Sequence, residues 1–165
     1  IELILNGKSL GKEKVGEENR FKAIFDINYE NGRLEAVAYT EGKETGRTKL
    51  STVGEVTNIK VDIEKTELRA NGRDLAYINI SLGDKDGNIN MNEVKKVKIE
   101  VEGQGTLQGF GSADPKSLEN FYDKERTTYD GKLLAVIRSN HEVGKIKVKL
   151  TTEDGIIKNL VIPVI

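Results

Sequence analysis

The sequence predicts an all-β protein built from antiparallel β-sandwich units. In most segments apolar residues recur at every second position, which is the period of a strand rather than of a helix. Asn-Gly and Asp-Gly pairs separate these segments, and both glycine and asparagine reach a positive φ at little cost. Many short strands divided by such turns are typical of a sandwich rather than a parallel sheet.

The first elements are a hairpin and an alternating run. Asn6-Gly7 suits a two-residue turn between the strands that it joins in Leu5–Leu10. Phe21, Phe25 and Tyr29 then share one face of an alternating run, so we expect a strand whose aromatic residues, with Tyr39, belong to the core. The later alternating runs predict strands over 59–63, 75–82, 97–101, 106–110 and 146–150.

One segment has the pattern of a helix. Asp114 could cap it, Pro115 suits its first turn, and Leu118, Phe121 and Tyr122 lie at the spacing of one helical face. We expect at most two turns, lying across an open end of a sandwich and packing onto it.

A domain boundary is predicted between Ser51 and Val56, where one alternating run ends before another begins. The chain then divides into residues 1–53 and 54–165. About 50 residues provide four strands, whereas a sandwich of this type needs about seven. The first unit is therefore expected to be a truncated sandwich, and the start at Ile1, inside a strand-like run, suggests an excised fragment.

Charge and composition exclude several partners. The 26 basic and 27 acidic side chains nearly cancel and are interleaved, so no nucleic-acid partner is expected. No run approaches the ~20 apolar residues of a membrane span, so no membrane insertion is expected. The chain has no cysteine, which excludes disulfides but leaves both a cytoplasmic and a secreted or cell-surface location open.

Asp84, Asp86 and Asn88 are the weak candidates for a calcium site, because oxygen-bearing side chains recur there at every second residue. The spacing departs from an EF-hand loop, since Gly87 stands fourth rather than sixth and Lys95 takes the place of the bidentate glutamate. We therefore interpret the segment as a solvated hairpin and expect no metal and no cofactor.

Three other motifs have a structural explanation. Asn92-Glu93 resembles the pair that carries the acid in glycosidase barrels, but no strand-helix alternation surrounds it. Gly103-Gln104-Gly105 precedes a strand rather than the helix that a phosphate-binding loop requires. His141, the only histidine, has no cysteine or second histidine with which to share zinc and is expected in an exposed loop. No catalytic residue is predicted.

Sugar-binding modules present aromatic faces, and this chain has no tryptophan, 5 tyrosines and 4 phenylalanines. The weak candidates for sugar stacking are Phe110, Phe121, Tyr122 and Tyr129. Because we expect the segment from Asp114 to Tyr122 to pack on its own sandwich, substitutions of Phe121 and Tyr122 are predicted to reduce stability rather than affinity.

Several ordered motifs resemble those of one enzyme family. The first half carries Leu5-Asn6-Gly7-Lys8-Ser9-Leu10-Gly11 and the run from Tyr29 to Tyr39. The second half carries Asn71-Gly72-Arg73-Asp74-Leu75, Val101-Glu102-Gly103-Gln104-Gly105 and Gly109-Phe110-Gly111-Ser112-Ala113-Asp114-Pro115. Their order is similar to that of the C-terminal immunoglobulin-like domains of β-galactosidases of glycoside hydrolase family 2.

This resemblance implies immunoglobulin-like sandwich units in tandem from a bacterial hydrolase, with the catalytic barrel upstream in the same polypeptide. The parent would hydrolyse β-galactosides or related glycosides. The segment itself would be no enzyme but a support for the barrel, for contacts with another subunit or for the β-galactoside entrance. Two alternatives remain, a carbohydrate-binding module and the stalk domain of a cell-surface adhesin. A stalk predicts internal repeats, and the two halves share no motif in register.

Overall fold

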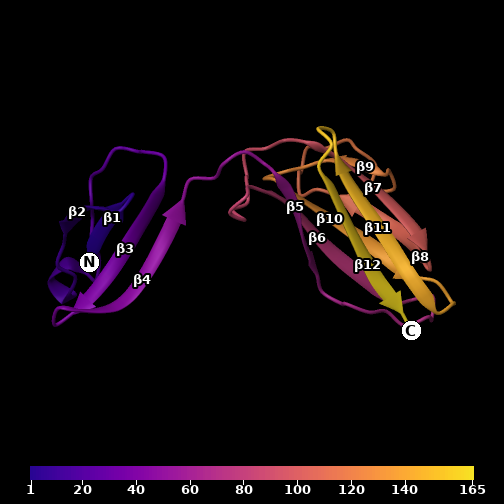
Figure 1. Ribbon diagram of the computed structural model, residues 1–165, viewed down its shortest axis with the longest axis horizontal. Coiled ribbons are helices and arrows are strands. Elements are labelled where there is room, and N and C mark those ends of the chain that lie inside the picture. The colour runs from indigo at the N-terminus through magenta and orange to yellow at the C-terminus, as the bar shows by residue number, and fades with distance from the viewer. The chain divides into compact units, whose positions relative to one another are not determined.

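The computed structural model describes all 165 residues and divides them into two compact units, Ile1–Thr52 and Val53–Ile165. Both units are built from antiparallel strands (Figure 1). The all-β prediction is therefore confirmed. The structure contains no helix with the length and the apolar character that crossing a membrane requires.

The first unit contains a single four-stranded sheet in the order β2-β1-β3-β4. Its strands are β1 (Glu2–Leu5), β2 (Lys8–Lys12), β3 (Arg33–Thr40) and β4 (Lys43–Ser51). Leu5 pairs with Lys8, so Asn6-Gly7 forms the predicted two-residue turn, with φ of 51° and 81°. One sheet without a second is what the sequence predicts for a truncated sandwich.

The strand predicted over Phe21–Tyr29 is absent, and this prediction is wrong. Only a short 3-10 helix, η1 (Glu17–Asn19), lies between β2 and β3. Arg20 and Phe21 both have a positive φ, at 52° and 58°, which ends any extended run there, and the segment pairs with no strand. Phe21 and Tyr29 are 74% and 79% exposed, so these aromatic residues do not form a core.

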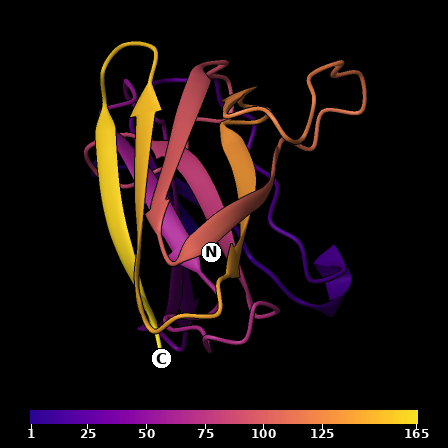
Figure 2. The same cartoon turned by 90° about the vertical axis from the view of Figure 1, so that its right-hand side faces the viewer.

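The second unit is a sandwich of two antiparallel sheets, β5-β6-β10-β8 and β12-β11-β7-β9 (Figures 1 and 2). Its strands are β5 (Asn58–Ile63), β6 (Leu75–Gly83), β7 (Lys96–Gly103), β8 (Gly105–Gly111), β9 (Glu125–Thr127), β10 (Lys132–Ser139), β11 (Gly144–Thr152) and β12 (Ile157–Val164). This arrangement is consistent with the immunoglobulin-like sandwich expected from the sequence.

The core of the second unit lies between its two sheets. The inward positions of β6 and β10 are buried at every second residue, and those of β7 and β11 face them from the other sheet. Ile78, Ile99 and Leu150 are fully buried, as the strand period predicts. Phe110 of β8 is also fully buried and supplies the one aromatic side chain of this core.

No helix forms between Asp114 and Tyr122, so this prediction is also wrong. Residues 112–124 connect β8 to β9 through turns and project from one end of the sandwich (Figure 2). The Asp114 side chain accepts a hydrogen bond from the Lys116 backbone N–H at 2.9 Å, and Asn120 does the same for Tyr122 at 3.1 Å. These local bonds favour turns over a helix, and Leu118 is left fully exposed.

Candidate functional site

Arg126 anchors the connection between β8 and β9. Its side chain is 1% exposed although it carries a full charge. The Nε atom donates to the Phe110 carbonyl at 2.8 Å, and Nη1 lies 3.4 Å from the Glu119 carboxylate. Since an unpaired buried charge is costly, these bonds hold residues 119–126 against the end of β8.

Glu119 is held in turn by Thr127. The Thr127 hydroxyl donates to Oε1 at 2.7 Å, and the Thr127 backbone N–H lies 3.2 Å from both carboxylate oxygens. Partial burial opposes ionisation, but these bonds and Arg126 outweigh it, so the pKa of Glu119 lies below its ordinary value. Glu119 is therefore an ionised partner for the buried guanidinium.

The Phe121 ring lies against Arg126 and against Gly111 of β8. The Arg126 guanidinium carbon is 4.7 Å from the ring centroid, within cation-π range. The Phe121 carbonyl accepts a hydrogen bond from the Phe110 N–H at 2.8 Å. A Cβ atom at Gly111 would come within 2.5 Å of the ring, so any larger residue there would require the ring to move.

A groove of about 330 Å³ lies beside this ring in the second unit. Leu134 and Val136 of β10 form its apolar floor, and Leu134 is paired with Asn79 of β6 on one side and with Gly111 of β8 on the other. The complete lining is Asn79, Gly111, Ser112, Ala113, Phe121, Lys132, Leu133, Leu134 and Val136. The groove thus combines an apolar floor, an aromatic wall and a few polar side chains, which is typical of small-ligand sites.

The structure separates the four aromatic candidates. Phe110 is in the core, whereas Phe121 is 61% exposed and lines the groove. Tyr122, 79% exposed, and Tyr129, 41% exposed, are outside the groove lining. The expected packing onto the sandwich is wrong for Tyr122 and holds for Phe121 only through its contacts with Gly111 and Arg126.

Asn79, Lys132, Leu134 and Val136 line the groove, although the sequence pattern did not indicate them as members of a site. A signal was present, because residues 133–137 form a continuous apolar run whereas most other strands alternate with charged residues. Apolar residues on both faces of a strand indicate that the outer face also meets something apolar.

The calcium candidates lie within one loop that is held together by hydrogen bonds. The Asp84 side chain is buried, and its two oxygens accept four bonds: from the N–H of Gly54, Asp86 and Asn88 and from the Asn88 side-chain amide, at 2.8 to 3.0 Å. The Gly54 bond is the largest of the contributions that lower the pKa of Asp84 to about 2. No group of three or more acidic or histidine side chains is arranged to hold a metal.

The remaining motifs keep structural roles. The Glu93 backbone carbonyl accepts a hydrogen bond from the Thr128 hydroxyl, and the Glu93 side chain lies 4.0 Å from the ammonium of Lys95. Gly103, at a φ of 87°, begins the turn into β8 rather than a helix. His141 is exposed in the loop between β10 and β11, as predicted.

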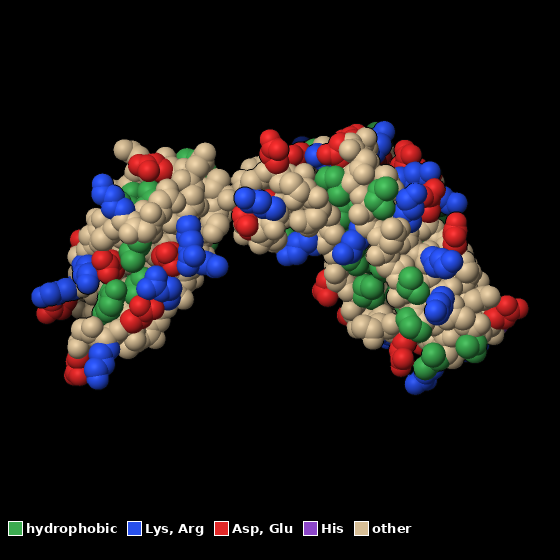
Figure 3. Space-filling view, viewed as in Figure 1, with side chains coloured by type: hydrophobic (Ala, Val, Ile, Leu, Met, Phe, Trp, Pro, Cys, Tyr) green, Lys and Arg blue, Asp and Glu red, His purple; other side chains and the backbone are tan.

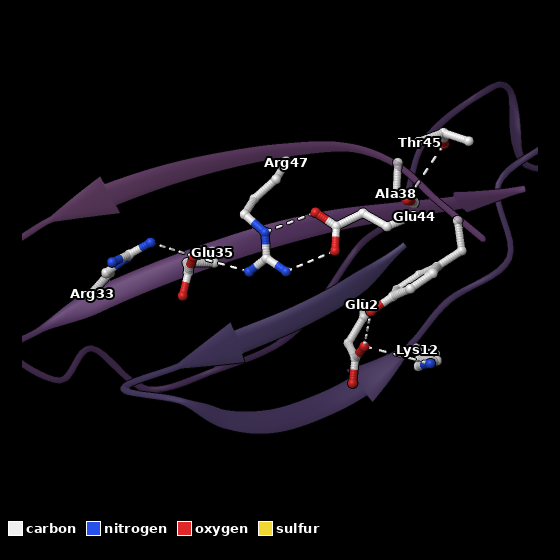
Figure 4. Close-up of polar contacts among 9 residues, drawn as sticks. Glu2, Lys12, Arg33, Glu35, Ala38, Glu44, Thr45 and Arg47 are labelled. Atoms are coloured by element: carbon white, nitrogen blue, oxygen red, sulfur yellow. Dashed lines mark hydrogen bonds and ion pairs between the residues drawn. The ribbon is translucent and has the colours of Figure 1, made fainter. Parts of the chain in front are cut away.

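One face of the first unit carries linked charges (Figure 4). The Arg47 guanidinium donates to Glu44 and to Glu35, and Arg33 donates to the same Glu35 oxygen at 2.7 Å. Hydrogen bonds from Arg47, followed by those from Arg33, lower the pKa of Glu35 below its ordinary value. Each carboxyl group whose pKa departs clearly from its ordinary value has a lowered pKa: Glu2, Glu35, Glu44, Asp74, Asp84, Glu100, Glu119 and Asp154.

Comparison with protein families gives two matches. Residues 59–157 match the family described as glycoside hydrolase family 2 C-terminal domain 5, and residues 1–46 match a domain of unknown function, DUF4982. The first match covers more than half of the chain and nearly the whole of the second unit.

Curated relatives are several times longer than this chain. The β-galactosidase BoGH2A of Bacteroides ovatus is 30% identical over 93% of this chain, which spans 18% of that protein. A putative β-glucuronidase of Formosa agariphila is 31% identical over 77% of the chain, which spans 13% of its length.

Solved structures agree in fold. A glycosyl hydrolase family 2 member from Bacteroides cellulosilyticus superposes with a TM-score of 0.89 and 34% identity over 99% of this chain and 21% of that one. A β-glycosidase from Bacteroides vulgatus, 21% identical over 98% of this chain and 21% of its own, gives a TM-score of 0.82 and supports the fold alone. The chain therefore belongs to the C-terminal domain 5 family of glycoside hydrolase family 2.

Proposed function

We propose that this chain is a non-catalytic, structural region of a retaining glycosidase whose whole polypeptide hydrolyses β-galactosides or related glycosides. The observation that carries the proposal is the family match over residues 59–157, within relatives of which this chain spans less than a fifth. In this proposal the chain supports an upstream catalytic barrel, a contact with another subunit or the entrance for substrate.

The chemistry of the described carboxyl groups supports a role without catalysis. A retaining glycosidase needs two carboxyl groups about 5 Å apart, of which one has a raised pKa and acts as the acid. Each carboxyl group whose pKa departs clearly from its ordinary value has a lowered pKa. These side chains are paired with cations or with N–H and O–H donors. Such carboxylates are stabilised as acceptors and are poor proton donors.

The test is an assay of the purified chain with p-nitrophenyl β-galactoside and p-nitrophenyl β-glucuronide. We expect no release of nitrophenol above the rate in buffer. Hydrolysis that copurifies with the chain and is abolished by Glu93→Gln would overturn the proposal, because Glu93 is the one residue whose sequence context resembles that of a glycosidase acid.

A second assay addresses the structural role in the whole parent polypeptide. Leu133→Ala, in the core of the second unit, should lower the temperature at which the parent loses activity, while kcat/KM measured well below that temperature stays unchanged. A parent whose heat inactivation is unaffected would contradict a supporting role.

A further inference from the structure

The outer face of β6, β10 and β8 is less polar than a solvated sheet face normally is. Tyr77 and Leu134 are each 39% exposed there, beside the partly buried Val136. Gly109 and Gly111 stand opposite Val136 and Leu134 on β8, and the Phe121 ring lies in the space that a side chain at Gly111 would take. Figure 3 shows charged side chains of both signs interspersed with hydrophobic ones on one face of the molecule.

The aromatic wall of the groove makes several contacts within the chain. Phe121 is held by its backbone bond to Phe110, by the contact of its ring with Gly111 and by Arg126 at 4.7 Å. Phe121 lines the groove, whereas Arg126 does not. A rigid aromatic side chain loses little conformational entropy when a ligand stacks on it.

Three polar side chains at the groove have unused hydrogen-bonding groups. The side chains of Asn79, Ser112 and Lys132 make no hydrogen bond or ion pair within the chain. Lys132 is also the one charged residue of the lining. The groove therefore offers an amide, a hydroxyl and an unpaired positive charge around an apolar floor.

We propose that this groove binds a single uronic acid unit of a glycan, a pyranose ring that carries a carboxylate. Its C–H face would stack on Phe121 and Leu134, its hydroxyls would bond Asn79 and Ser112, and its carboxylate would pair with Lys132. The volume suits one sugar ring with its immediate substituents rather than a protein segment. One unpaired cation also matches a single carboxylate better than the several charges of a nucleotide.

This site goes beyond the supporting role proposed above and does not depend on the activity of the parent. Binding to one exposed groove of this kind should be weak, in the millimolar range, because a single small ring buries little surface. It should weaken further as salt is added, since the pairing with Lys132 is solvent-exposed.

The test is an NMR titration of the isotope-labelled chain with methyl β-glucuronide and, separately, with methyl β-galactoside. We expect saturable amide shifts at residues 79, 111–113, 121 and 132–136 with the uronide, and weaker binding of the neutral sugar. Phe121→Ala should weaken uronide binding roughly threefold to tenfold. Lys132→Gln should reduce uronide affinity to that of the neutral sugar.

Tyr122→Ala is the matched control, because Tyr122 is adjacent in sequence and more exposed but lies outside the lining. It should bind like the wild type, and thermal melting of each variant should show that the fold persists. If Phe121→Ala unfolds, Phe121→Leu keeps most of the packing and removes the aromatic face. The proposal would be overturned if neither sugar shifted any amide signal or if both sugars bound equally well. Shifts that depend on protein concentration alone would also overturn it, because they would indicate self-association.

Discussion

Asp84 is the residue on which the start of the second unit depends. Its buried carboxylate joins Gly54, at the beginning of that unit, to the loop after β6 through four hydrogen bonds. The Asn58 side chain adds a bond of 2.6 Å to the Asp84 carbonyl. Removal of the carboxylate would leave several N–H donors without an acceptor.

We therefore expect Asp84→Ala to lower the melting temperature of the second unit by several degrees. Asp86→Ala is the matched control, since Asp86 is exposed in the same loop and its backbone N–H still reaches Asp84. Differential scanning calorimetry measures both variants. Equal melting temperatures in the two variants would contradict the role given to the Asp84 carboxylate.

The same residue predicts a dependence on pH. Its pKa is about 2 in the folded protein and 3.8 ordinarily, so the folded state favours the ionised form. The resulting stability is present above about pH 4 and is lost as the pH falls toward 2. The midpoint of urea unfolding should therefore fall over this window, and the fall should be shallower in Asp84→Ala. Identical pH profiles of the variant and the wild type would exclude this contribution.

At the scale of elements, β10 shows how the two faces of one strand divide their roles. Leu133 is 5% exposed and belongs to the core, whereas its neighbour Leu134 is 39% exposed on the groove floor. Leu133→Ala should cost about 3 kcal/mol of unfolding free energy, and Leu134→Ala less than about 1 kcal/mol. Urea unfolding followed by circular dichroism measures the pair. A similar cost at both positions would contradict this assignment of faces.

The β1-β2 hairpin depends on its turn. Gly7 has a φ of 81°, which a residue with a Cβ adopts only at a cost, so Gly7→Ala should destabilise the first unit by about 1 kcal/mol. Gly16→Ala is the control, because Gly16 is extended and has free space around it. Chemical unfolding followed through hairpin amide signals compares the two. A larger effect at Gly16 would be inconsistent with this turn.

At the scale of the whole molecule, the two units differ in how fully they bury apolar surface. The second has a continuous core between two sheets, whereas the first has one sheet and leaves Phe21, Ile24 and Leu50 more than 70% exposed. We therefore propose that residues 53–165 form an independent domain. Expressed alone, they should unfold cooperatively within a few degrees of the full chain in calorimetry. A gradual transition without a heat peak would contradict this independence.

The sequence by itself determined the strands in which apolar and charged residues alternate, the Asn6-Gly7 turn and the family. These depend on local periodicity, local backbone geometry and motif order, respectively. The local pattern wrongly predicted a strand over Phe21–Tyr29, because a strand also needs a partner strand. It also wrongly predicted a helix over Asp114–Tyr122, where side-chain hydrogen bonds to the backbone favour turns. Only the tertiary structure brought Asn79, Leu134 and Gly111 into one row beside Phe121. Residues that far apart become neighbours through strand pairing, which single-strand periodicity does not specify.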